Sequence, residues 1–223
     1  MGVPFDTQRI GQSAVEYTPS LAGHKIITAA NGFLDTAESP AHSGGGGIID
    51  TWLSFYGYAP GDIEWSAAFA NTMHRSAGYT PPRDTAVLAQ MYNTALSQSV
   101  TSRLPYHGCF VMTVTLLGDG VTLDATADSG GAHSVALYAY WHNKPANMAV
   151  VIGGDSPDSD ETNDIVDYRF INTMTPDPTH PERTTRFVVP TYLRKVRARG
   201  LVALPGAEAA ASKPLTKRTP SGH

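Results

Sequence analysis

The order of apolar and polar residues predicts helices in the first half of the chain. From Ser20 to Leu34, apolar residues mostly recur at intervals of three and four, which places them on one face of a helix. A short helix or turn is expected over residues 48–57. Asp62 is suited to cap a helix that runs to about Ala77, and Asp84 to cap a further helix after two prolines.

The helix expected after Asp62 has one wide apolar face. Trp65, Ala68, Phe69 and Met73 share that face. Because the helix offers no other wide apolar stripe, we expect these side chains to be buried against a sheet.

From Gly108 onward the pattern changes to short segments rich in β-branched and aromatic residues, which predict strands. Gly118–Gly120 (GDG) is typical of a hairpin turn and not of a phosphate loop, since no helix follows it. Helices followed by antiparallel strands predict an α+β domain with the helices packed on the sheet. The expected strands are CFVMTVTLL, VTLDAT, HSVALYAYW, NMAVVIGG, Ile165–Phe170 and Arg186–Val189.

Length and charge divide the chain into three parts. Its 223 residues suffice for one large domain, expected over residues 21–190 between an N-terminal arm (1–20) and a basic, extended C-terminal tail (191–223). Residues 183–223 hold nine Lys/Arg and one Glu, whereas the rest holds seven basic and nineteen acidic side chains. The acidic body argues against nucleic-acid binding, and the tail is expected to contact protein partners in an assembly.

Several classes of protein are excluded or disfavoured. With Cys109 as the single cysteine, the chain can form neither an internal disulfide nor a cysteine-based zinc site. The acidic stretch Asp155–Asp167 lacks the spacing of an EF-hand loop and is expected to be solvated, so we expect no metal and no cofactor. No apolar run is long enough to span a membrane, and no signal peptide is evident. We therefore expect synthesis in the cytoplasm, which leaves incorporation into a virion or export by a non-Sec route open.

Two segments carry candidate chemistry: Glu64–Phe69 (EWSAAF), at the start of a helix, and Gly130–Val135 (GGAHSV), at the start of a strand. In this order, over about residues 25–170, the chain resembles the CHAP and NlpC/P60 group of papain-like peptidoglycan hydrolases. Those families place a nucleophilic cysteine in a Trp-Cys-Ala-Ala-Phe motif and a base in a Gly-His-Val motif. The chain is most similar to an uncharacterised branch that carries Trp-Ser-Ala-Ala-Phe.

The resemblance implies a papain-like NlpC/P60-type fold and hydrolysis of a peptidoglycan amide bond, as an amidase or an endopeptidase. In that assignment Ser66 is the nucleophile and His133 the general base. The third polar group is Asp155, in a segment similar to the Gly-Gly-Asn of some of these families, or His142, further along the strand of His133. The ligand would be peptidoglycan or a cell-wall peptide.

A serine in the cysteine position also supports a different function. Near neutral pH a thiol is partly ionised, whereas a hydroxyl stays protonated and needs a well-aligned base. A serine in a first helical turn is commonly a cap, and a histidine at a strand start is commonly a hydrogen-bonded boundary residue. The alternative is an inactive member of the fold that serves as a structural or cell-wall-binding component of a phage tail or similar assembly.

Overall fold

The structure is a computed structural model that describes most of the predicted domain. The N-terminal arm up to residue 19 and the tail from residue 195 lie outside the described residues, and so does the predicted partner contact of that tail. The structure describes residues 20–98, 100–102, 105–143, 148–157, 163–172 and 180–194.

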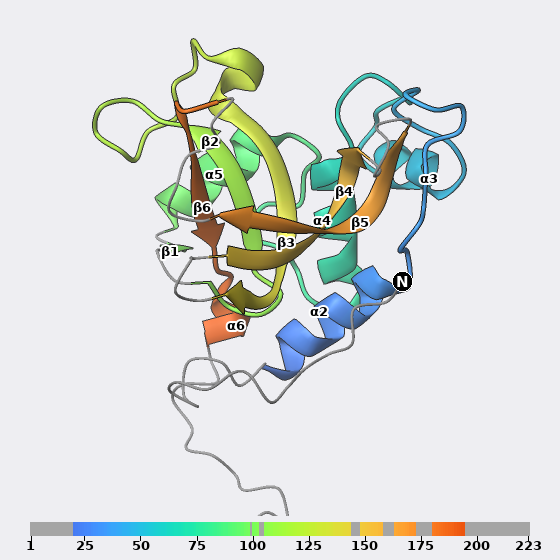
Figure 1. The fold of residues 1–223 in the computed structure, drawn as a ribbon, viewed down its shortest axis with the longest axis horizontal. Coiled ribbons are helices and arrows are strands. Elements are labelled where there is room, and N and C mark those ends of the chain that lie inside the picture. The colour runs from blue at the N-terminus through green and yellow to red at the C-terminus, as the bar shows by residue number, and fades with distance from the viewer. Residues whose placement is uncertain are drawn as a thin grey trace, which may run out of the picture.

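Within the residues that the structure describes, five helices and a short 3-10 turn form the helical part of the domain (Figure 1). The first described helix begins after Ser20, whose hydroxyl accepts a hydrogen bond from the Gly23 N–H at 2.9 Å. Its predicted apolar face is buried, with Ile26 and Ile27 among its members. The helical elements are α2 (Leu21–Asn31), α3 (Ile48–Ser54), α4 (Ser66–Ser76), α5 (Leu88–Ser97), η2 (Asp128–Gly131) and α6 (Thr191–Arg194).

The strands in the described part of the chain form one six-stranded sheet in the order β1-β6-β2-β3-β4-β5, with every neighbouring pair antiparallel. Helices come first in the chain and the sheet second, which confirms the predicted α+β class. The strands are β1 (Thr101–Ser102), β2 (Phe110–Thr115), β3 (Ala132–Asn143), β4 (Met148–Pro157), β5 (Asp164–Asn172) and β6 (Arg183–Val188).

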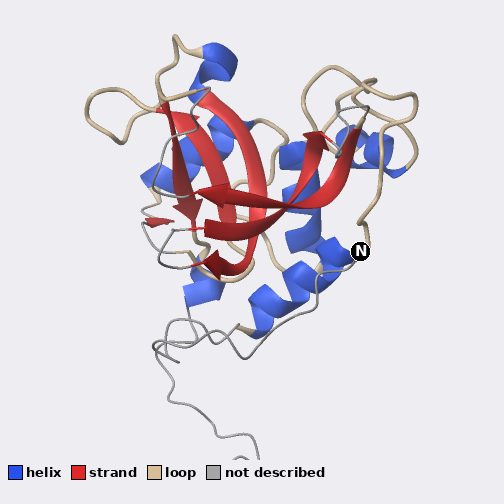
Figure 2. Ribbon diagram, in the orientation of Figure 1, coloured by secondary structure: helices blue, strands red, loops and turns tan. Residues whose placement is uncertain are grey.

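Helix α4 is the centre of the helical layer. It packs on β3 and β4, while α2 and α3 pack on α4 and α5 packs on β3; in the view of Figure 2, α4 and α5 lie behind the strands. Trp65 and Phe69 are fully buried, and their rings surround Trp52 of α3 at centroid distances of 5.8 and 5.5 Å. Ala68 and Met73 are also buried, so the predicted apolar face is confirmed.

The predicted cap of the central helix was wrong. Helix α4 begins at Ser66, with Trp65 at the N-cap position and no side-chain cap. The Asp62 carboxylate instead accepts a hydrogen bond from the Ala59 N–H at 2.8 Å and so closes a turn before the helix. An aspartate side chain can accept a hydrogen bond from a helix N-terminus or from a nearby turn, and here Asp62 accepts from the turn.

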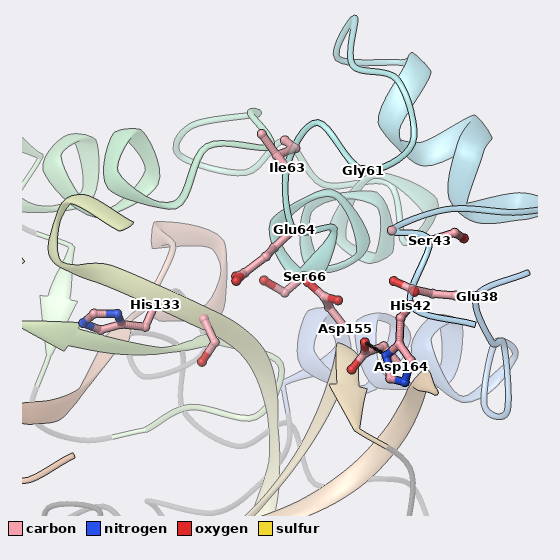
Figure 3. A pocket seen from close by; sticks show the side chains of 12 residues that line it. Glu38, His42, Ser43, Gly61, Ile63, Glu64, Ser66, His133, Asp155 and Asp164 are labelled. Atoms are coloured by element: carbon pink, nitrogen blue, oxygen red, sulfur yellow. Dashed lines mark hydrogen bonds and ion pairs between the residues drawn. The ribbon is translucent and has the colours of Figure 1, made fainter. Parts of the chain in front are cut away.

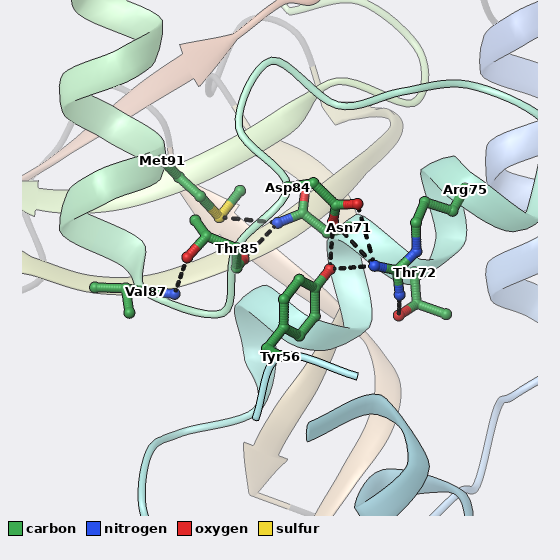
Figure 4. Close-up of polar contacts among 8 residues, drawn as sticks. All are labelled: Tyr56, Asn71, Thr72, Arg75, Asp84, Thr85, Val87 and Met91. Atoms are coloured by element: carbon green, nitrogen blue, oxygen red, sulfur yellow. Dashed lines mark hydrogen bonds and ion pairs between the residues drawn. The ribbon is translucent and has the colours of Figure 1, made fainter. Parts of the chain in front are cut away.

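Asp84 does not cap a helix either. Helix α5 begins at Leu88, and the Asp84 carboxylate binds Arg75 of α4 at 3.0 Å and the Tyr56 hydroxyl at 2.5 Å. Asn71 donates to the Thr85 carbonyl at 2.6 Å within the same set of contacts (Figure 4). These side chains attach the loop between α4 and α5 to the face of α4.

The strand predicted over VTLDAT was also wrong. The segment makes one isolated bridge, between Leu116 and Leu123. The Asp119 carboxylate accepts hydrogen bonds from the N–H groups of Val121 and Thr122, both at 2.8 Å. In this turn a side-chain carboxylate accepts the hydrogen bonds of these amides. In a strand the same amides would bond to the main chain of a neighbouring strand.

The packed body continues beyond the boundary predicted at residue 190. Leu193 of α6 is buried, and the Tyr192 hydroxyl shares a hydrogen bond with Nδ1 of His74 in α4. The domain therefore includes α6 at least as far as residue 194. No helix of the described part of the chain is long and apolar enough to cross a membrane.

Helix α2 lies in close backbone contact with the segment before β2. A Cβ added at Gly23 would lie 2.1 Å from the His107 carbonyl oxygen, and that obstacle is main chain. We expect Gly23→Ala to lower the free energy of unfolding by about 1–3 kcal/mol through overpacking. Gly118→Ala is the matched control, because a Cβ there meets nothing within 4 Å. Urea denaturation of both variants measures the difference, and equal stabilities would show that α2 can move away.

Candidate functional site

A cleft of about 460 Å³ lies at the N-terminus of α4. The start of that helix, the start of β3, the end of β4 and the start of β5 converge there, together with the loop that follows α2 (Figure 3). Its described lining contains four carboxyl groups and neither lysine nor arginine. The polar side chains that matter for its chemistry are Glu38, Glu64, Ser66, His133, Asp155 and Asp164.

Ser66 reaches the cleft from the first position of α4. The residue is 1% exposed, and its Oγ is buried without a hydrogen-bond partner among the described residues. A buried hydroxyl that lacks a partner costs roughly 1–3 kcal/mol. The site therefore leaves the hydroxyl without the aligned base that a nucleophilic serine requires.

His133 lines the same cleft, but its ring is directed away from Ser66 (Figure 3). It is the extra residue of a β-bulge, because Ser134 pairs with Thr113 while Ala132 pairs with Val114. Burial, followed by the positive charge of Arg183, lowers the pKa of His133.

A hydrogen bond fixes that direction of the His133 ring. Nε2 of His133 lies 2.8 Å from Oγ1 of Thr115, the last residue of β2. The structure thus brings Ser66 and His133 to one cleft without pairing them.

Asp155 lies in the cleft at a distorted position of β4. Its φ is 60°, in the left-handed region, where the register with β5 shifts between Gly153 and Ser156. Its Oδ2 accepts a hydrogen bond from the Trp65 N–H at 3.1 Å, at the positive end of α4. The main chain before Ser66 thus orients Asp155, and the described contacts include none between Asp155 and His133.

The acidic surroundings change how readily Asp155 ionises. Burial, followed by the negative charges of Glu64, Asp164 and Glu38, raises the pKa of Asp155 to about 7. Burial and the charge of Asp164 also raise the pKa of Glu64. Negative charge is therefore concentrated in the cleft and only partly compensated, which favours binding of a cationic ligand.

His142, the other candidate for the third group, lies on β3 nine residues after His133. A strand advances about 3.3 Å per residue, so nine residues span roughly 30 Å. The structure therefore carries the backbone of His142 towards the far end of the strand; its side chain lies outside what the structure describes.

The sequence interpretation did not identify Glu38 and Asp164 as site residues. Glu38 is 5% exposed, and its Oε1 accepts a hydrogen bond from the Trp65 indole N–H at 2.8 Å. The Glu38 N–H donates to the Asp164 carbonyl at 3.1 Å, which joins the loop after α2 to β5. The one available signal was the acidic stretch that contains Asp164, whereas nothing in the sequence marked Glu38.

The remaining candidate nucleophile, Cys109, is buried beside β2. Burial raises the pKa of its thiol to about 12, with smaller opposing effects from backbone hydrogen bonds. A thiol with so high a pKa is protonated at neutral pH and unreactive.

The fold and the site define an α+β domain with an acidic cleft at the N-terminus of its central helix. Comparison of the chain with protein-family models, curated proteins and solved structures finds no match.

Proposed function

We propose that this chain is a papain-like domain of the NlpC/P60 and CHAP type that binds cell-wall peptide in its acidic cleft without cleaving it. The observation that carries the proposal is the separation of the two expected catalytic groups. Ser66 Oγ is buried without a partner, and the His133 ring is held by Thr115. The chain order supports the family assignment: a helix that opens with Ser66 precedes a strand of the antiparallel sheet, β3, whose second residue is His133.

The charge of the cleft supports binding of a peptide with a free amino group. Four carboxyl groups without a lysine or arginine in the described lining attract such a cation. The charge asymmetry of the whole chain, with an acidic body and a basic C-terminal segment, supports a place in a repeating assembly such as a phage tail. In that role the domain would hold an assembly against the cell wall.

Binding is tested with purified peptidoglycan sacculi in a pelleting assay. We expect the full chain to co-sediment at about 0.05 M NaCl and to dissociate at about 0.5 M, because salt screens charge contacts in an open cleft. Glu64→Gln should weaken binding. Glu182→Gln, an exposed carboxylate outside the cleft lining, should not. Equal binding by wild type and Glu64→Gln would contradict the role of the cleft.

The second candidate function is hydrolysis of the peptidoglycan amide bond, favoured by the shared location of Ser66 and His133 in one cleft. It requires the His133 ring to leave Thr115 and turn towards Ser66. We expect wild type to release no soluble fragments from sacculi. We expect Ser66→Cys to react with iodoacetamide no faster than an ordinary thiol. Cleavage by wild type that Ser66→Ala abolishes at unchanged stability, or cleavage gained by Ser66→Cys, would replace the binding proposal with the hydrolase.

A further inference from the structure

Three carboxylates from separate segments meet in the cleft. Glu38 lies in the loop after α2, Asp155 near the end of β4, and Asp164 at the start of β5. One oxygen from each lies within 4.8 Å of the others. Like charges this close repel one another, which favours protonation or a nearby cation. His42, whose Nδ1 lies 3.3 Å from Asp164 Oδ2, offsets part of this charge when it is protonated, and a bound cation would offset the rest.

Two buried oxygens of the cleft, one of them outside the three carboxylates, have no hydrogen-bond partner among the described residues, which indicates a ligand. Oε2 of Glu38 is buried and unpartnered, although Oε1 of the same carboxylate binds the Trp65 indole. Oγ of Ser66 is likewise buried and unpartnered, and Ser66 lines the same cleft. Buried polar atoms are nearly always satisfied, and an ion or a water molecule is one partner that can satisfy those that no protein group contacts.

We propose that Glu38, Asp155 and Asp164 bind one calcium ion in the cleft, with the Ser66 hydroxyl as a further oxygen in its surroundings. The inference does not depend on the proposed function, because it rests on these four residues and not on the substrate. The sequence alone predicted no metal site, since the acidic stretch lacks EF-hand spacing. The structure supplies Glu38 from a loop more than a hundred residues earlier.

The oxygen ligands and their spacing select the ion. Carboxylate and hydroxyl oxygens are hard ligands that suit Ca²⁺ and Mg²⁺ better than zinc or copper. Ca²⁺ binds oxygens at about 2.3–2.6 Å, so two of its ligands lie up to roughly 5 Å apart. Mg²⁺ binds at about 2.0–2.1 Å and limits that separation to roughly 4 Å. The three oxygens lie within 4.8 Å of one another, a spacing that falls inside the range one Ca²⁺ ion spans.

The ligands are held by the core of the domain. The indole N–H of Trp65 binds Glu38, and its main-chain N–H binds Asp155. Asp164 is fixed through its main-chain carbonyl, which accepts the Glu38 N–H, and its Oδ2 lies 3.3 Å from Nδ1 of His42. A bound ion would therefore connect the loop after α2 to the ends of β4 and β5, and we expect it to raise the melting temperature.

The test is calorimetric titration of the EDTA-treated full chain with CaCl2, in the absence of peptidoglycan. We expect one site with a Kd below about 1 mM and a melting temperature that rises with calcium. Glu38→Gln keeps an oxygen for the Trp65 indole but loses the charge, and Asp164→Asn makes the same change in β5. Each variant should bind calcium at least tenfold more weakly.

Asp35→Asn is the control, because it neutralises an exposed carboxylate three residues before Glu38 and outside the cleft lining. It should bind calcium as wild type does. Circular dichroism in EDTA establishes that each variant is folded. No calcium binding by folded wild type, or equal binding by wild type and both cluster variants, overturns the site. Tighter binding of Mg²⁺ than of Ca²⁺ overturns the assignment to calcium. Failure of the peptidoglycan assay leaves the calcium titration unaffected, so the two proposals fail separately.

Discussion

Replacing Phe69 by alanine is expected to lower the free energy of unfolding by about 3–5 kcal/mol, the usual cost of truncating a buried aromatic side chain. Phe69 is fully buried on α4, with the rings of Trp52 and Trp65 at 5.5 and 6.5 Å. Gly154 of β4 leaves room for the ring, since a Cβ there would lie 2.9 Å from Phe69. Contacts from helices and sheet on several sides leave little scope for collapse around a cavity.

Chemical denaturation measures this effect, with Phe55→Ala as the control for the same chemical change. Phe55 is 62% exposed, so its truncation should cost less than about 1 kcal/mol. A loss below 1 kcal/mol for Phe69→Ala would mean that the α4 face is not part of the core.

Acid is expected to destabilise the domain through His74. This histidine of α4 is fully buried and stacked on Phe110 at 4.1 Å. Burial lowers its pKa from the ordinary 6.5 to about 3. Below pH 6.5 the unfolded chain binds a proton that the folded chain does not, so the folded state loses stability as the pH falls towards 3. The slope is about 1.4 kcal/mol per pH unit, or roughly 2 kcal/mol between pH 7 and pH 5.

Denaturation of wild type and His74→Phe at several pH values isolates this effect. The phenylalanine preserves an aromatic ring beside Phe110 but cannot titrate, so the variant should lose less stability on acidification than wild type does. Other titrating groups, including the half-buried His107, contribute to both proteins and cancel in the comparison. Parallel pH profiles for wild type and His74→Phe would mean that His74 binds a proton as readily in the folded protein as in the unfolded chain, which would contradict the prediction.

The elements that could be predicted from the sequence are those set by local periodicity. The apolar face of α4 repeats at helical spacing, and β3 and β4 are continuous runs of strand-forming residues, so their identity depends little on distant contacts. The ends of helices were less predictable. Asp62 and Asp84 are common cap residues, yet each found another partner, and that choice depends on where Ala59 and Arg75 lie in three dimensions.

In the candidate site, too, some features could be predicted from the sequence and others depend on contacts between distant segments. The resemblance to the NlpC/P60 and CHAP group implied that Ser66 and His133 would approach each other, and one cleft does contain both. The direction of the His133 ring depends on one extra residue in the pairing of β2 with β3, which periodicity does not reveal. The meeting of Glu38 with Asp164 depends on a contact between segments far apart in the chain. A single sequence contains no local signal for such a contact.

Trp65 links the interior of this domain to its cleft. Its ring is buried among the aromatic side chains, while its two N–H groups hold Glu38 and Asp155. A substitution that loosens the aromatic packing would therefore also displace the carboxylates, even without touching the cleft. Selection for a more stable core and selection for a different ligand would both act on Trp65. This domain therefore has little freedom to change its stability without also changing its cleft.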